Sequence, residues 1–171
     1  MPTARISSID MAEFLIGKIN SVSAVAGTVV KERKRLDSEE LAPVETDDYC
    51  NFIADIEGDV AASFIITRCA IGNENTIKFD IFGTEGVISF NLNNPNTLAV
   101  CIGEIDKKAN GLHNVNVPAE FRITQEQMFI DMVNGKDCKY LPTVADGLHC
   151  QAILDSLLIS SEEKRWVKIH D

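Results

Sequence analysis

Apolar residues recur at helical spacing near the start of the chain. Ile9 and Ile16 lie on one face of a helix, and Gly17 follows where a helix would end. Ser7 and Asp10 have the spacing of a capping box, in which two side chains bind backbone N–H groups of the first turn. The pattern therefore predicts a helix that begins at Ser7 and stops before Gly17.

The next thirty residues combine an alternating apolar stretch with a charged one. Small and β-branched residues alternate from Ile19 to Arg33, which predicts one long strand. Residues 34–48 are charged, contain Pro43 and show no apolar period, so we expect a loop there. The basic cluster from Lys31 to Arg35 could bind an anion. Acidic residues flank it on both sides, however, and favour a solvated strand end.

A period of two begins at Tyr49 and continues to about Ile102. Short segments rich in Gly, Asn or Asp interrupt it at residues 57–59, 83–86 and 93–96, where tight turns are expected. The expected strands cover about residues 50–56, 62–66, 77–81, 88–92 and 98–102, with a short sixth at 113–117. Strands joined by tight turns pair in antiparallel order, so the region predicts an antiparallel meander.

The last third of the chain returns to helical spacing. Thr124 and Gln127 form a capping box that opens a helix ending at Gly135. Thr143 and Asp146 form a second box, which opens a longer helix to about Ser160, and residues 165–169 read as a closing strand. We therefore expect one α+β domain over residues 1–171, in two layers, with a predominantly antiparallel open sheet and helices on one face.

The alternation of the meander also assigns two faces to the expected sheet. The helices should cover an apolar layer made of Ala62, Phe64, Ile66, Ile77, Phe79, Ile81, Ile88, Phe90, Leu92, Leu98, Val100 and Ile102. The opposite face carries mainly small, uncharged residues: Ala61, Ser63, Ile65, Thr67, Lys78, Asp80, Ser89, Asn91, Ala99 and Cys101. Because a water-facing sheet usually carries many charges, we expect this open face to pair with a second copy in a homo-oligomer.

Net charge and composition narrow the range of partners. The formal charge of −10 repels phosphate backbones and anionic lipid, so we expect neither nucleic acid nor a membrane surface as a partner. No apolar stretch is long enough to span a bilayer, and the first residues lack the pattern of a secretory signal. The five widely spaced cysteines fit reduced packing residues, and we expect a cytoplasmic location.

No complete catalytic or metal-binding constellation is visible. His113, His149 and His170 are scattered, without partners at the spacing of a metal site. No serine lies in a Gly-x-Ser-x-Gly elbow. Gly83 and Gly86 join two expected strands, whereas a dinucleotide fingerprint leads from a strand into a helix. We therefore expect no catalytic residue, no metal and no cofactor within this chain.

Arg68 is the one side chain that suggests a ligand. It ends an expected strand just before a polar segment that contains Gly72. A guanidinium in that place can clamp a carboxylate or a polyol, which makes Arg68 a candidate substrate-binding residue. A surface salt bridge to one of the many acidic residues is the alternative, and the residues alone favour it.

Three segments, in this order and spacing, carry a family resemblance: residues 9–24 (IDMAEFLIGKINSVSA), residues 52–91 (FIADIEGDVAASFIITRCAIGNENTIKFDIFGTEGVISFN) and residues 142–169 (PTVADGLHCQAILDSLLISSEEKRWVKI). They resemble the C-terminal domain of the Gfo/Idh/MocA family, which contains NAD(P)-dependent sugar and inositol oxidoreductases. The resemblance covers nearly all of the chain, from Ile6 to Ile169.

The resemblance implies a nucleotide-binding domain that precedes this one, with a Gly-rich loop for NAD or NADP and a catalytic lysine. It also implies a histidine at the helix that contains Asp10, and Ser7 stands in that place here. Because loop, lysine and histidine are not in this sequence, we expect the chain alone to be inactive. It would then be a truncated piece, a proteolytic fragment or the product of a split gene.

Two roles follow from the resemblance. The domain would wall the substrate site of the parent oxidoreductase, where Ser7 and Arg68 would contact a small sugar, polyol or similar CH–OH compound. It would also form homo-oligomer contacts and pack against the nucleotide-binding domain of the parent. The alternative is a free-standing, non-catalytic ligand-binding or scaffolding module, which the serine at position 7 favours slightly.

Overall fold

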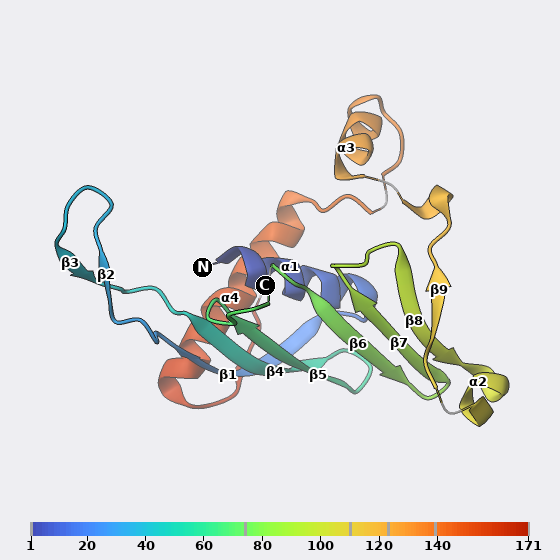
Figure 1. Ribbon diagram of the computed structural model, residues 1–171, viewed down its shortest axis with the longest axis horizontal. Helices are drawn as coiled ribbons and strands as arrows, with labels where there is room; N and C mark the ends of the chain where they lie inside the picture. The colour runs from blue at the N-terminus through green and yellow to red at the C-terminus, as the bar shows by residue number, and fades with distance from the viewer. Residues whose placement is uncertain (1, 74, 110, 123, 139, 171) are drawn as a thin grey trace. The chain divides into compact units, whose positions relative to one another are not determined.

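A computed structural model describes residues 2–73, 75–109, 111–122, 124–138 and 140–170. The chain forms two compact units, one from residues 1–71 and 142–171 and the other from residues 72–141 (Figure 1). That the two units make the one domain expected over residues 1–171 stays a prediction. The α+β class, with open antiparallel sheets, is confirmed.

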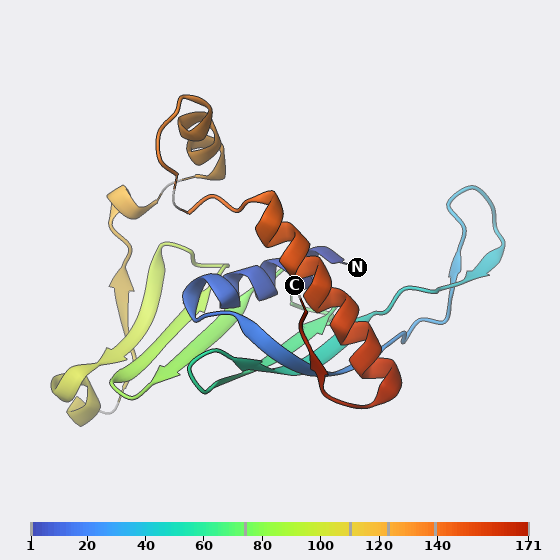
Figure 2. The ribbon, with the colours of Figure 1, turned by 180° about the vertical axis from the view of Figure 1, so that it is seen from behind.

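The first unit is built on a four-stranded antiparallel sheet in the order β10-β1-β4-β5. Its strands and helices are α1 (Pro2–Leu15), β1 (Ile19–Gly27), β4 (Tyr49–Ile56), β5 (Val60–Thr67), α4 (Val144–Glu163) and β10 (Val167–Lys168). Helix α4 packs along β1, as the view from behind shows (Figure 2). Both helices lie on one face of this sheet, and Val25, Ile53 and Ile65 remain exposed on the other.

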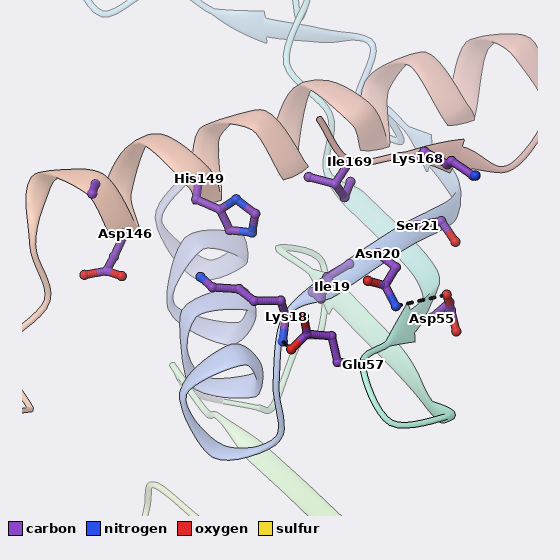
Figure 3. A pocket seen from close by; sticks show the side chains of 11 residues that line it. Lys18, Ile19, Asn20, Ser21, Asp55, Glu57, Asp146, His149, Lys168 and Ile169 are labelled. Atoms are coloured by element: carbon purple, nitrogen blue, oxygen red, sulfur yellow. Dashed lines mark hydrogen bonds between the residues drawn. The ribbon is translucent and has the colours of Figure 1, made fainter. Parts of the chain in front are cut away.

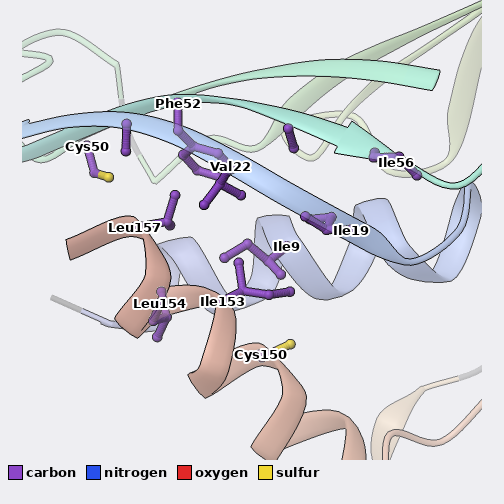
Figure 4. Packing of buried hydrophobic residues seen from close by; sticks show 12 residues of the cluster. Ile9, Ile19, Val22, Cys50, Phe52, Ile56, Cys150, Ile153, Leu154 and Leu157 are labelled. Atoms are coloured by element: carbon purple, nitrogen blue, oxygen red, sulfur yellow. The ribbon is translucent and has the colours of Figure 1, made fainter. Parts of the chain in front are cut away.

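The core of the first unit lies between these helices and the sheet (Figure 4). Helix α4 starts at the expected capping box, because Thr143 and Asp146 each bind the backbone N–H of the other. Its Ile153 and Leu157 are fully buried, at helical spacing. The buried cluster comprises Ile9, Ile19, Val22, Ala24, Cys50, Phe52, Ala54, Ile56, Cys150, Ile153, Leu154 and Leu157.

Two serines of α4 complete the outer edge of β1, which β10 covers only at Ser21 and Val22. The Ser160 hydroxyl accepts a hydrogen bond from the Ala24 N–H at 2.9 Å, and the Ser161 hydroxyl accepts one from the Ala26 N–H at 2.8 Å. Backbone N–H groups beyond the short strand β10 are thereby satisfied inside the protein.

Two expectations about the first fifty residues are wrong. Helix α1 begins at Pro2, so Ser7 and Asp10 lie inside the helix instead of capping it. A proline fits the first position of a helix, where its missing N–H costs nothing. The long strand expected to reach Arg33 ends at Gly27, because the Asp48 carboxylate accepts hydrogen bonds from the backbone N–H groups of Val29 and Val30 just beyond it.

The charged segment expected to be a loop contains a second hairpin. Strand β2 (Glu32–Lys34) pairs with β3 (Leu41–Pro43) in a two-stranded sheet of its own. We call residues 28–47 the arm, since they extend from the ends of β1 and β4 away from the rest of the first unit (Figure 1).

The second unit has its own four-stranded antiparallel sheet, in the order β6-β7-β8-β9, so the single continuous sheet that we expected is wrong. The elements are β6 (Lys78–Gly83), β7 (Gly86–Asn91), β8 (Thr97–Ile102), α2 (Gly103–Ala109), β9 (His113–Asn116), η1 (Ala119–Phe121) and α3 (Gln125–Val133). The turn at Gly83 and Gly86 is confirmed as a hairpin. A side chain at Gly86 would collide with the carbonyl oxygen of Cys101.

Helix α2 is only seven residues long and was not expected from the sequence. Acidic residues in its first turn and Lys107 and Lys108 in its last suit the helix dipole. The pairs across the strands agree with the expected alternation of faces, since Phe52 pairs with Phe64 and Phe79 pairs with Phe90. Among the described residues of the second unit, none is fully buried, so its apolar layer is only partly covered.

Candidate functional site

A cavity of about 650 Å³ opens in the first unit at the end of the sheet where β1 begins (Figure 3). The start of β1 with the residue before it, the first two turns of α4, the end of β4 with the turn that follows, and β10 surround it. Its lining consists of Lys18, Ile19, Asn20, Ser21, Asp55, Glu57, Ala145, Asp146, His149, Lys168 and Ile169. Most of these side chains are polar, so the cavity can bind a polar ligand.

Glu13 contacts three of the residues that line this pocket. It lies in the last turn of α1, and its side chain is only 6% exposed. Its Oε1 accepts a hydrogen bond from the Ile19 N–H at 2.8 Å and lies 2.9 Å from His149 Nε2. Its Oε2 lies 3.4 Å from Lys18 Nζ. One carboxylate therefore joins α1, β1 and α4.

The interior side of the pocket is rich in negative charge. Burial raises the pKa of the Asp10 carboxyl, and the nearby carboxylates of Asp146 and Glu13 raise it further. Burial, followed by the charges of Asp10 and Glu13, raises the pKa of the Cys150 thiol to about 11. Cys150 is therefore protonated at neutral pH and does not serve as a nucleophile.

Donors and acceptors alternate around the opening of the pocket. The Lys18 side chain extends toward His149 and Asp146 (Figure 3), and the Asn20 amide donates to Asp55 Oδ2 at 3.4 Å. Such a set suits a ligand with several hydroxyl groups. Among the described residues, no group of three or more His, Cys, Asp or Glu side chains could hold a metal ion.

Arg68 lies at the other end of the same strands. Its N–H donates to the carbonyl oxygen of Asp48 at 2.8 Å, immediately before β4 begins. The pocket residue Asp55 lies seven residues further along β4, a span of about 23 Å in an extended strand. The structure therefore does not bring Arg68 into the pocket. Its side chain is exposed, as the candidate role requires.

Ser7 also lies outside the pocket lining. It belongs to α1, with its side chain exposed, two turns before the end of the helix. The structure thus places each candidate on the surface of the first unit, and a substrate role for either stays a prediction.

Asp48 is the buried charge next to Arg68. Its carboxylate, 1% exposed, accepts hydrogen bonds from the Val29 and Val30 N–H groups at 2.8 and 2.9 Å and lies 3.8 Å from Arg33 Nη2. The bond from Val30 is the main cause that lowers the pKa of this carboxyl, and the charges of Arg33 and Arg68 contribute. Its stabilising effect is present above the ordinary carboxyl pKa of about 4 and is lost as pH falls through the lowered value.

Sequence reasoning missed Glu13, His149 and Asp48 as site residues. One signal for Glu13 was available, because it occupies the helical stripe of Ile9 and Ile16, where an apolar residue is expected. A carboxylate on a buried stripe indicates a specific partner. That partner, His149, is 136 residues away and could not be identified from spacing.

Comparison with known proteins finds similarity to oxidoreductases. Residues 6–89 match the family model described as GFO/IDH/MocA C-terminal domain. A curated relative, the levoglucosan dehydrogenase of Pseudarthrobacter phenanthrenivorans, is 27% identical over 192 residues, which cover 94% of this chain and 49% of that protein. The chain therefore spans about half the length of this relative.

Solved structures give the same result. A levoglucosan dehydrogenase in complex with NADH and L-sorbose matches with a TM-score of 0.84 and 27% identity, over 97% of this chain and 49% of the other. An oxidoreductase domain protein from Kribbella flavida matches with a TM-score of 0.84 and 26% identity, over 97% of this chain and 48% of the other.

Within the described residues, no helix is long and apolar enough to cross a membrane.

Proposed function

This chain carries a Gfo/Idh/MocA C-terminal domain, and we propose that it walls the substrate site of an NAD(P)-dependent oxidoreductase. The substrate is a sugar, a polyol or a similar compound with a CH–OH group. The match over 97% of the chain to a dehydrogenase in complex with NADH and a sugar carries this proposal. NAD or NADP then binds to the nucleotide-binding domain of the parent protein, and the chain alone is inactive.

Arg68 and Ser7 are the proposed substrate contacts of the domain. The position of Arg68 supports this role. Its backbone N–H is bound to Asp48 just after β5, and its exposed guanidinium can present a fork of donors. Because Arg68 lies far from the pocket, we expect Arg68 and the pocket to make different contacts. A free-standing ligand-binding module, which would use the pocket without any redox partner, is the competing function.

In the parent protein, Arg68→Ala should lower kcat/KM for the sugar substrate by about ten- to a hundredfold, the value of one lost charged hydrogen bond. The melting temperature should change little, since Arg68 is the smallest of the causes that act on the buried Asp48 carboxyl. Formation of NAD(P)H measured with a panel of sugars and polyols, together with calorimetric unfolding, tests both expectations.

Arg165→Ala is the matched control for this experiment, because the exposed Arg165 side chain binds nearby groups of the chain, Glu163 and the carbonyl oxygen of Trp166. It should leave kcat/KM unchanged. If Arg68→Ala lowers activity only in proportion to its loss of stability, the residue is a surface ion-pair partner and the substrate contact is rejected.

We also propose that the open face of the first unit's sheet associates with the same face of a second copy. On β5, Ile65 is 82% exposed. Its cross-strand neighbour Asn51 on β4 and Ser63, two residues before it on β5, are uncharged. An exposed isoleucine among small residues suits close approach of a second sheet. Lys78 and Asp80, which we had placed on the same face, belong to the other sheet.

Ile65→Glu should dissociate this dimer, because two-fold symmetry places two unpaired carboxylates in one interface. Sedimentation equilibrium at tens of micromolar protein measures the change. Ile105→Glu is the matched control, since Ile105 is 84% exposed on α2, and it should leave the association intact. A wild-type chain that is monomeric at this concentration rejects the interface.

A further inference from the structure

The arm is exposed to solvent along most of its length. Every described side chain from Lys31 to Leu41 is exposed, and Leu36 and Leu41 are 109% and 67% accessible. An isolated two-stranded hairpin is at best marginally stable in water. The arm nevertheless projects as an ordered ribbon in both views (Figures 1 and 2). A second contact surface would account for it.

The hydrogen bonds within the arm show which of its edges is open. The Arg35 N–H donates to the Glu40 carbonyl oxygen, and the Val44 N–H donates to that of Lys31. Residues 31 and 35 therefore direct their backbone groups toward β3, and by alternation Glu32 and Lys34 direct theirs outward. No other described strand pairs with this edge of β2.

The outer edge of β3 is a poor alternative for pairing. Its outward residues are Leu41 and Pro43, and proline has no N–H to donate. The edge of β2 offers a donor and an acceptor at each of its two outward residues. Added strands bind to such an edge by main-chain hydrogen bonds.

We propose that β2 pairs with β2 of a second copy of this chain, in antiparallel order about a two-fold axis at Arg33. This register places Glu32 of each copy opposite Lys34 of the other, so the arrangement forms two ion pairs along with the ladder. Registers centred on Glu32 or Lys34 instead place like charges opposite each other. Hydrogen-bond direction permits this register, and charge favours it over the other two.

Arg33 faces its own counterpart across the axis, which would be unfavourable for two unpaired cations. Each Arg33 guanidinium, however, lies 3.8 Å from the buried Asp48 carboxylate of its own chain. That carboxylate also binds the N–H groups of Val29 and Val30 at the base of the arm. Asp48 therefore binds the backbone at the base of the arm and offsets the positive charge of Arg33.

Disulfide formation tests the register directly. Opposed residues of a non-hydrogen-bonded antiparallel pair have Cα atoms about 4.5 Å apart, within the range that a disulfide spans. In the full chain carrying Cys69→Ser, Arg33→Cys should form a covalent dimer under mild oxidation. Leu36→Cys and Leu41→Cys, on the same arm, should stay largely monomeric. Equal cross-linking at all three positions, or none at position 33, overturns the proposal.

A mixing experiment tests the ion pairs, because the homodimers and the heterodimer are built from the same two variants. One variant carries Glu32→Lys and the other carries Lys34→Glu. Both also carry Arg33→Cys, and a tag distinguishes them. The two are mixed in equal amounts and oxidised. Complementary charges in the mixed pair should raise the heterodimer well above the one-half share of random pairing, and high salt should reduce the excess. A one-half share at low salt overturns the proposal. Ile65→Glu in all chains keeps the sheet-face association out of the measurement.

Discussion

Leu157→Ala should lower the free energy of unfolding by about 3 kcal/mol, within the range of buried leucine truncations. Leu157 is fully buried on α4, against the side chains of β1 and β4 (Figure 4). Removing its branched end leaves a cavity, and the surrounding residues are fixed by the sheet on one side and by α1 on the other. The loss therefore includes both the transfer of the side chain and the cavity.

Urea denaturation followed by circular dichroism measures this change. Leu158→Ala is the control with the same chemistry on the same helix, because Leu158 is 46% exposed. It should cost less than about 1 kcal/mol. If the two variants lose the same stability, α4 does not pack through the face that contains Ile153 and Leu157.

Ser160→Ala should lower the free energy of unfolding by about 2 kcal/mol, although it removes a single oxygen atom. The Ser160 hydroxyl is completely buried; it accepts from the Ala24 N–H at 2.9 Å and donates to the Arg165 carbonyl oxygen at 2.6 Å. The alanine variant leaves both backbone groups without this partner in the interior. The cost is the desolvation of those groups, since alanine fits the helix well.

Ser156→Ala is the control for Ser160→Ala, because it also removes a buried hydroxyl group from α4. Ser156 is 8% exposed, and its hydroxyl donates to the Ala152 carbonyl oxygen within the same helix. Its replacement should be nearly neutral, because that carbonyl also accepts the helical hydrogen bond. Hydrogen exchange of the Ala24 amide should accelerate in Ser160→Ala only. Unchanged exchange at Ala24 would contradict the assigned contact.

The sequence predicted most elements that depend on contacts within a few residues. The capping box of Thr143 and Asp146 starts α4 where expected, and Gly83 and Gly86 close a hairpin. The exposure of Ile65 on an open face also followed from alternation, because side chains of a strand point to opposite faces in turn. Each of these features is decided by local periodicity or by one short turn.

The candidate site was predicted only in part. Arg68 was selected from its place at the end of a strand, and that place is confirmed. Its neighbour Asp48 was not selected from the sequence. An aspartate in a charged segment gives no sign that its carboxylate becomes buried and ends β1. The pocket was also missed, since Lys18, Asp55 and His149 come from three distant parts of the chain.

By itself the sequence therefore determined the class of the fold, the family resemblance, and the alternation of faces along each strand. Tertiary structure decided where β1 ends, how the strands divide between two sheets, and which polar residues meet. The physical reason is the range of the interactions. Caps and turns are satisfied within about four residues, whereas the Ala24 N–H and the Glu13 carboxylate are satisfied by side chains 136 residues away.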